Sequence, residues 1–128
     1  MSEYVTDTQA LVKFMTDEKV ISQTYQNIFE DTDKGINSII IPAIVIMEIL
    51  YLFEKSRIPV GIFDVEKLLE SKNYIVEPLS LDILKVASEI DDIPELHDRL
   101  IAATSKYLDI PIITNDAAIH NSKHTKTA

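Results

Sequence analysis

The residues of this sequence with the clearest chemical potential are four acids, Asp7, Glu48, Asp98 and Asp116. All four offer carboxylate oxygens, the ligand type that hard divalent cations such as Mg²⁺ and Mn²⁺ prefer. Two such ions about 4 Å apart suit an in-line attack of water on a phosphodiester, with one ion at the attacking oxygen and one at the leaving oxygen. This chemistry has to be weighed against a simpler structural role for each acid.

Asp7 and Asp116 each follow a predicted strand and precede a predicted helix. Asp7 comes after the extended run 4–6, and Asp116 follows closely on the apolar run 110–114. In a parallel sheet, ligands lie beyond the carboxyl ends of the strands, so the two acids would share one crevice if their strands are neighbours. The alternative is that each acid only caps the helix that it precedes.

Glu48 interrupts an otherwise apolar helix. It is the one acid among positions 43–53, and no Lys or Arg occurs from residue 35 to residue 54. A carboxylate that is buried without a partner either becomes neutral or finds a cation. Glu48 is therefore a candidate metal ligand. The alternative is a protonated or hydrogen-bonded core residue, or a helix edge that reaches solvent.

Asp98 lies near the start of a helix that is predicted to run from Pro94 to about Leu108. Its position is well off the apolar stripe of that helix. The stripe is formed by Leu96, Leu100, Ala103 and Tyr107. An acid in the first turn is favoured by the helix dipole, which is a sufficient explanation for Asp98 taken alone. The functional interpretation depends on the four acids as a set.

The elements that would position these acids alternate between strand and helix. Extended runs are predicted at 3–6, 38–41, 74–76 and 110–114, and helices at 8–16, 20–29, 42–55, 63–71, 81–90 and 94–108. The run Ser38-Ile39-Ile40-Ile41 is typical of a strand that is buried on both faces. The alternation predicts an α/β fold with helices on both faces of a mostly parallel sheet.

The bulk composition narrows the class of protein. A chain of 128 residues is long enough for one domain with a real core. The net charge of −9 is unusual for a nucleic-acid binder, which usually carries a basic stripe. A cluster of carboxylates that binds divalent cations would account for part of this negative charge. The absence of cysteine excludes disulfides, thiolate metal sites and thiol nucleophiles. With no signal peptide and no membrane span in the sequence, we expect a cytoplasmic protein.

With these residues placed, the sequence resembles the PIN domain family, particularly the VapC-type ribonuclease toxins. Three segments carry the resemblance: "VTDTQALV" (5–12), "IIIPAIVIMEILYL" (39–52) and "HDRLIAATSKYLDIPIITND" (97–116). The resemblance implies a three-layer α/β/α sandwich that cleaves RNA with Mg²⁺ or Mn²⁺. The metal-binding and catalytic acids that it implies are Asp7, Glu48, Asp98 and Asp116, with Thr114 and Asn115 as polar residues beside the last acid.

The resemblance also implies partners and a domain layout. We expect a homodimer, an RNA substrate and a small antitoxin protein that could insert an Arg or Lys among the acids. A single nuclease domain is expected over residues 1–120, followed by a polar tail at 121–128. This tail lacks the apolar strand that many relatives place near the end. The sheet is therefore expected to have one strand fewer, or the tail to be unstructured.

Several other functions are compatible with acids at strand ends. A receiver domain would need an acidic pair near the first strand and a Lys after the last, and the sequence has neither at these places. An aspartate-nucleophile phosphatase would need a second Asp two residues after Asp7, where this sequence has Gln9. Both classes are therefore disfavoured. A PIN-fold RNA-processing nuclease without an antitoxin, and a non-catalytic binding module, stay open as alternatives.

Residues near the acids have ordinary explanations in the sequence. His97 is expected to pack or to form a hydrogen bond rather than act as a general acid. Lys55 and Arg57 could steer RNA but are expected to be surface charges. Tyr51, Leu52 and Phe53 are expected to be core or dimer contacts rather than a platform for base stacking.

Overall fold

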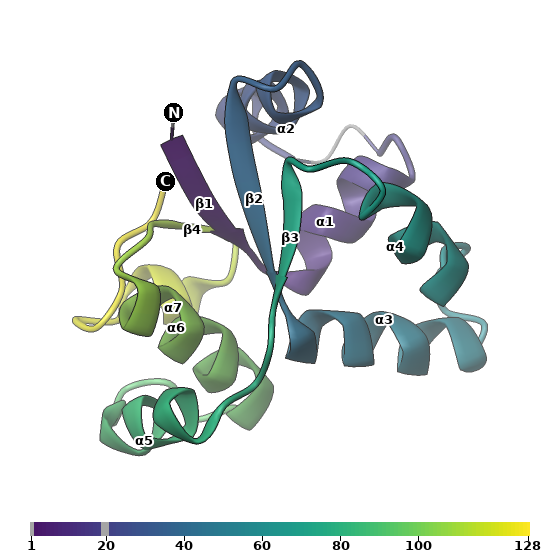
Figure 1. Cartoon of the computed structure of the whole chain (residues 1–128). Coiled ribbons are helices and arrows are strands. Elements are labelled where there is room, and N and C mark those ends of the chain that lie inside the picture. The colour runs from purple at the N-terminus through teal and green to yellow at the C-terminus, as the bar shows by residue number, and fades with distance from the viewer. Residues whose placement is uncertain (1, 19–20) are drawn as a thin grey trace.

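A sheet of four parallel strands forms the centre of the computed structural model, which describes residues 2–18 and 21–128. The strand order is β3-β2-β1-β4 (Figure 1). The strands are β1 (Ser2–Thr6), β2 (Asn37–Pro42), β3 (Tyr74–Glu77) and β4 (Ile112–Ile113). Because β1 pairs with both β2 and β4, residues that follow β1 and β4 meet at one edge of the sheet.

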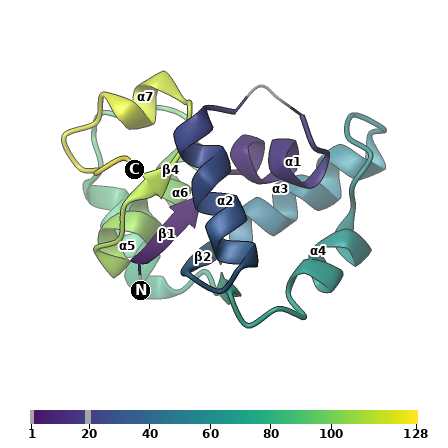
Figure 2. The ribbon, with the colours of Figure 1, turned by 90° about the horizontal axis from the view of Figure 1, so that it is seen from above.

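Seven helices flank this sheet within the described part of the chain. They are α1 (Thr8–Met15), α2 (Gln23–Asp33), α3 (Ala43–Glu54), α4 (Ile62–Leu68), α5 (Leu81–Glu89), α6 (Leu96–Leu108) and α7 (Ala117–His120). In Figure 1, α3 and α4 lie to the right of the sheet and α5, α6 and α7 to the left. Seen from above in Figure 2, α2 lies between α1 and α7. The predicted α/β/α arrangement with a parallel sheet is confirmed.

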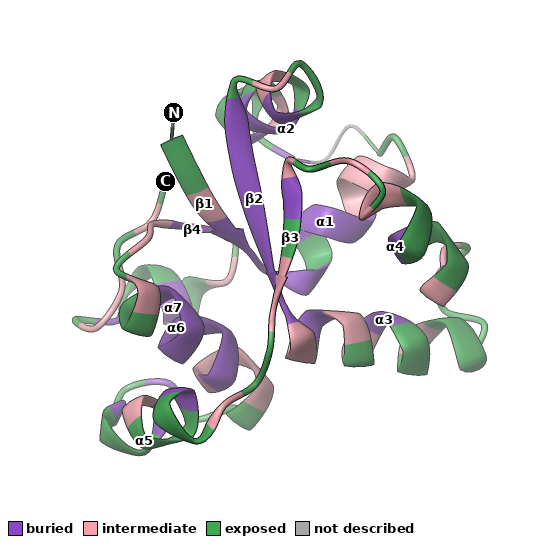
Figure 3. Cartoon of the chain, in the orientation of Figure 1, coloured by how far each residue is buried: buried purple, intermediate pink, exposed green. Residues whose placement is uncertain are grey.

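Strand β2 is the buried centre of the core. Its six residues are all buried, and Ile39 and Ile41 have no exposed surface (Figure 3). Side chains on both faces of this strand are covered by helices, which is why the run Ile39-Ile40-Ile41 is continuously apolar rather than alternating. The sequence-based prediction of a strand buried on both faces is confirmed.

The boundaries of several predicted elements differ by two or more residues from those in the structure, among them α2, β4, α4, which ends at Leu68 rather than Ser71, and α6, which begins at Leu96 rather than Pro94. Helix α2 begins at Gln23, after Ser22 accepts a hydrogen bond from the Tyr25 amide, and ends before Gly35, whose φ is +81°. The predicted start at residue 20 lies outside the described residues. Strand β4 is limited to two residues, shorter than the predicted run 110–114.

The C-terminal segment folds back along β4. The Ile112 amide donates to the Lys126 carbonyl (2.9 Å), the Ala128 amide donates to the Ile112 carbonyl (2.9 Å), and Thr127 forms a parallel bridge with Ile112. The Ser122 hydroxyl donates to Asp92 (2.8 Å). The tail is therefore ordered against the outer edge of β4, although it contributes only a single bridge.

None of the described helices has the length and apolar character needed to cross a membrane.

The stacked pair Phe14 and Phe29 gives a test of the core. The two ring centroids lie 4.5 Å apart, and Phe29 has no exposed surface. We expect Phe29→Ala to lower the free energy of unfolding by about 3–5 kcal/mol, because it removes a large buried ring and leaves a cavity. Phe63→Ala is the matched control, since Phe63 is 82% exposed and should change stability little. Equal effects of the two substitutions in urea denaturation would contradict this packing.

Candidate functional site

One pocket of about 390 Å³ brings the four predicted acids together. It lies where β1 and β4 end, between the start of α1, the middle of α3 and the start of α6. Its lining residues are Asp7, Thr8, Gln9, Glu48, Leu52, Asp98, Ile101, Asn115, Asp116 and Ala117. The four acids, which lie up to 109 positions apart in the sequence, thus meet in one crevice at the carboxyl edge of the sheet, as the strand-end rule predicts.

Asp7 is both a helix cap and a pocket residue. One carboxylate oxygen accepts from the Ala10 amide (2.8 Å) and caps α1, and the other accepts from the Thr114 hydroxyl (2.5 Å). The strand register makes the second bond possible, because Thr6 pairs with Ile113 and the Asp7 amide donates to the Ile113 carbonyl (3.1 Å). The capping interpretation is therefore correct without excluding a functional role.

Both the hydroxyl and the carbonyl of Thr114 form hydrogen bonds. Its hydroxyl donates to Asp7 and accepts from the Asp116 amide (3.0 Å). Its carbonyl accepts from the Tyr25 hydroxyl (3.0 Å), and Nε2 of His120 also lies within hydrogen-bond distance of it. Thr114 thereby fixes Asp7 and Asp116 relative to each other. Asp116 in turn caps α7 by accepting from the Ile119 amide (3.0 Å).

Glu48 is positioned by a residue that the sequence analysis did not single out. The Thr8 hydroxyl donates to Oε1 of Glu48 (2.6 Å), which links α1 to α3 across the pocket. The only sequence signal for Thr8 is that it directly follows Asp7. His97 lies 3.9 Å from Glu48 and 3.2 Å from Glu95, and nearly half of its side chain is exposed. It is therefore paired with acids at the rim rather than packed in the core.

The pocket concentrates negative charge, and among the described residues only His97 lies close enough to one of its four acids, Glu48, to form an ion pair. Burial raises the pKa of Asp7, and the bonds from Thr114 and Ala10 offset this only in part. Burial, followed by the charges of Asp116, Glu95, Glu48 and Asp7, raises the pKa of Asp98 to about 6. Across residues 2–18 and 21–128, no Lys or Arg forms an ion pair with any of the four acids. Oxygen ligands with excess negative charge fit a divalent cation.

The pocket acids are spaced more widely than ligands that all touch one ion. Within the described residues, only Asp91, Asp92 and His124 bring three potential ligand atoms within 4.8 Å of one another. That group lies outside the pocket, and Asp91 there is paired with Lys123 and His124. Mutual repulsion favours wider spacing among the pocket carboxylates, and Mg²⁺ commonly keeps several waters rather than binding protein oxygens alone.

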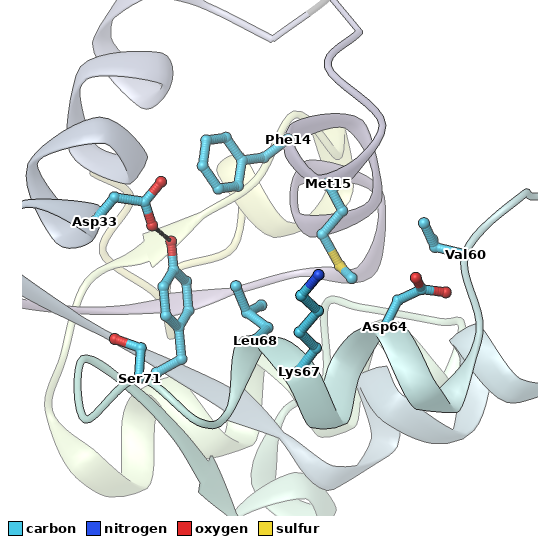
Figure 4. A pocket seen from close by; sticks show the side chains of 9 residues that line it. Phe14, Met15, Asp33, Val60, Asp64, Lys67, Leu68 and Ser71 are labelled. Atoms are coloured by element: carbon cyan, nitrogen blue, oxygen red, sulfur yellow. Dashed lines mark hydrogen bonds between the residues drawn. The ribbon is translucent and has the colours of Figure 1, made fainter.

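A second pocket, of about 410 Å³, lies between α1, α2, α4 and β3 and does not offer comparable chemistry (Figure 4). The Tyr74 hydroxyl donates to Asp33 (2.7 Å), and burial is the main cause that raises the pKa of Tyr74. The other acid in its lining, Asp64, accepts from the Gly61 amide (2.8 Å) at the start of α4. Both acids are thus engaged in holding the fold.

Comparison with known proteins agrees with the fold. The family model of the PIN domain matches residues 4–123, nearly the whole chain. No curated protein matches the chain in sequence.

Three solved structures with high similarity come from toxin–antitoxin complexes. A chain of VapBC2 from Rickettsia felis, bound to a DNA fragment from its promoter, has a TM-score of 0.72 at 19% identity and covers 98% of this chain and 97% of its own. A toxin–antitoxin complex from Klebsiella pneumoniae has a TM-score of 0.65 at 15% identity, with 97% and 96% covered. DNA-bound VapBC from Salmonella typhimurium has a TM-score of 0.71 at 14% identity, with 100% and 98% covered. These likenesses show the fold.

Charge repulsion in the pocket predicts that Asp98→Asn stabilises the metal-free protein at pH 7. A pKa raised to about 6 from the ordinary 3.8 means that Asp98 favours the folded state below pH 4, and that this contribution is lost as the pH rises through 6. Asn stays neutral, so the variant should gain about 1 kcal/mol over the wild type at pH 7, after allowance for screening of a half-exposed group, and nothing at pH 4.

The measurement is denaturant unfolding in EDTA at both pH values. Glu66→Gln is the control, because it makes the same change in net charge at an exposed position of α4. A gain at pH 7 no larger than that of the control would contradict repulsion at Asp98.

Proposed function

The chain belongs to the PIN domain family, and we propose on this basis that it is a divalent-metal-dependent endoribonuclease, the toxin of a toxin–antitoxin pair. The observation that carries the proposal is the pocket in which four carboxylates converge with no Lys or Arg of the described chain to neutralise them. Such an arrangement is costly for stability unless a cation binds there, and hydrolysis of a phosphodiester is chemistry that divalent cations in carboxylate sites perform.

The residues proposed to hold Mg²⁺ or Mn²⁺ are Asp7, Glu48, Asp98 and Asp116. When bound, the cation would withdraw charge from the phosphodiester oxygens and stabilise the charge that develops on them. Asp7 is held in place for this role by its two hydrogen bonds, and Thr114 aligns it with Asp116. Asn115 lines the same pocket and is proposed to contact the substrate or an ordered water.

The proposed toxin function rests on the proteins whose solved structures resemble this fold. The structural neighbours are chains of complexes described as VapBC or toxin–antitoxin. An antitoxin partner, a homodimer and a cytoplasmic location are proposed from this likeness. A small open reading frame immediately upstream of the gene would support the antitoxin. Its absence would favour a PIN-domain nuclease that acts in RNA processing.

Asp7→Asn tests the metal site without removing the helix cap, since Asn caps helices as well as Asp does. We expect Mn²⁺ to raise the melting temperature of the wild type and to leave that of the variant nearly unchanged, because a ligand that binds only the folded state must stabilise it. RNA cleavage in Mg²⁺ or Mn²⁺ should fall by more than about 100-fold, the upper range for loss of an outer partner of a metal ligand.

Two outcomes would overturn the nuclease proposal. One is RNA cleavage by the wild type that persists in excess EDTA. The other is full activity of Asp7→Asn together with an unchanged Mn²⁺ response.

Thr114 is proposed as a positioning residue, and the pair Thr114→Val and Thr114→Ser tests it. Val removes the hydroxyl that links Asp7 to the Asp116 amide, whereas Ser keeps it. We expect Val to weaken Mn²⁺ binding by about 10–100-fold and Ser to restore it, with cleavage by the Val variant recovering in part at high Mn²⁺. Equal Mn²⁺ affinities for the Val and Ser variants would refute this role.

A further inference from the structure

The acid pocket opens into a neighbouring groove that carries positive charge. This groove, of about 280 Å³, is called the basic groove below. It is lined by Thr8, Gln9, Val12, Lys13, Glu18, Leu52, Arg57 and Ile58. It shares Thr8, Gln9 and Leu52 with the acid pocket, so the two cavities are adjacent along α1 and the end of α3.

Lys13 and Arg57 have no intramolecular partner for their charges. Across residues 2–18 and 21–128, neither side chain forms an ion pair or a hydrogen bond, even though Glu18 lines the same groove. Some other basic side chains are engaged, whereas exposed lysines such as Lys72 and Lys85 also form no ion pair among the described residues but lie outside both cavities. The Arg99 guanidinium donates to the Ile93 and Pro94 carbonyls, and Lys123 pairs with Asp91. In a chain of net charge −9, two uncompensated cations beside the acid pocket are a local reversal of charge.

A polyanion that reaches the acids has to overcome their repulsion. A bound divalent cation neutralises charge at the cleaved phosphate, but the adjoining phosphates need positive charge outside the acid pocket. Lys13 lies six residues after Asp7 on α1, about 9 Å farther along the helix axis at 1.5 Å per residue, which places it beyond the reacting phosphate. A third cavity, lined by Met47, Glu48, Tyr51, Leu52 and His97, also adjoins the acids but has no Lys or Arg in its lining.

We propose that the basic groove binds a phosphate of the RNA strand next to the one that is cleaved, with Lys13 and Arg57 as its ligands; this rests on the proposed ribonuclease function. The Arg57 guanidinium presents a planar fork suited to a phosphate, and Lys13 adds a point charge from the opposite element. Val12, Leu52 and Ile58 supply an apolar part of the groove lining that suits the sugar. Arg57, expected from the sequence to be an ordinary surface charge, thereby acquires a role in substrate binding.

Binding of RNA by charge-matched variants tests this subsite. All proteins carry Asp116→Asn, which keeps the α7 cap and prevents cleavage, and the probe is a fluorescein-labelled single-stranded RNA of about 12 nucleotides, within the site sizes of single-strand binders. Lys13→Gln and Arg57→Gln should each weaken binding about fivefold in 0.1 M salt. Together they should lower the slope of log K against log salt by about 0.7, the value for one phosphate contact on a single strand.

The matched control is the double variant Lys72→Gln with Lys85→Gln. It makes the same change in net charge at two exposed positions outside the lining of the acid pocket and the basic groove. The control should bind RNA nearly as tightly as the parent. The same Lys and Arg substitutions are also made without Asp116→Asn. These proteins should keep the Mn²⁺-dependent rise in melting temperature, which would show that their acid pocket is intact.

The outcomes separate this inference from the proposed function. RNA binding by the Lys13 and Arg57 double variant that equals the control overturns the inference alone. The inference is also overturned if the Lys13 and Arg57 double variant still binds RNA but no longer binds a polyglutamate peptide that the parent binds. That result assigns the groove to an acidic protein segment. Failure of the parent to bind RNA, together with no cleavage by the wild type, overturns the proposed function and the inference with it.

Discussion

The hydrogen bond from the Thr114 hydroxyl to Asp7 is the interaction on which the arrangement of the pocket depends. It joins the ends of two neighbouring strands, and through the Asp116 amide it extends to a third element, α7. A carboxylate buried as deeply as Asp7 is costly unless donors satisfy it. The Ala10 amide and the Thr114 hydroxyl do so, which lets the fold hold a charged group at the edge of its core.

Among the other acids, Asp98 is held with less compensation than Asp7, and this lowers the stability of the fold. Asp98 has a raised pKa because burial and four neighbouring acids disfavour its charge. The rest of the core, including β2, whose residues are buried along its whole length, has to offset this loss of stability.

An acidic chain and an RNA substrate are compatible because electrostatics act locally. At physiological ionic strength, exposed charges farther apart than about 8 Å are largely screened. The net charge of −9 therefore says little about the groove where Lys13 and Arg57 stand unpaired. For the proposed RNA substrate, overall charge would affect the rate of encounter, whereas the placement of these two cations next to the acids would determine which part of a bound strand is held.

The amino-acid sequence by itself determined the alternation of strands and helices, the doubly buried β2 and the four acids that meet in the pocket. These follow from local patterns: apolar runs, caps, and acids at strand ends. The tertiary structure alone decided that Thr8 supports Glu48, that Lys13 and Arg57 flank the acids, and that the C-terminal segment lies along β4. It also decided that α6 is buried over six consecutive residues, 100–105, where an amphipathic stripe was predicted. Burial on several sides of a helix, and hydrogen bonds between residues 40 or more positions apart, depend on which elements become neighbours in space, and no local periodicity encodes that choice.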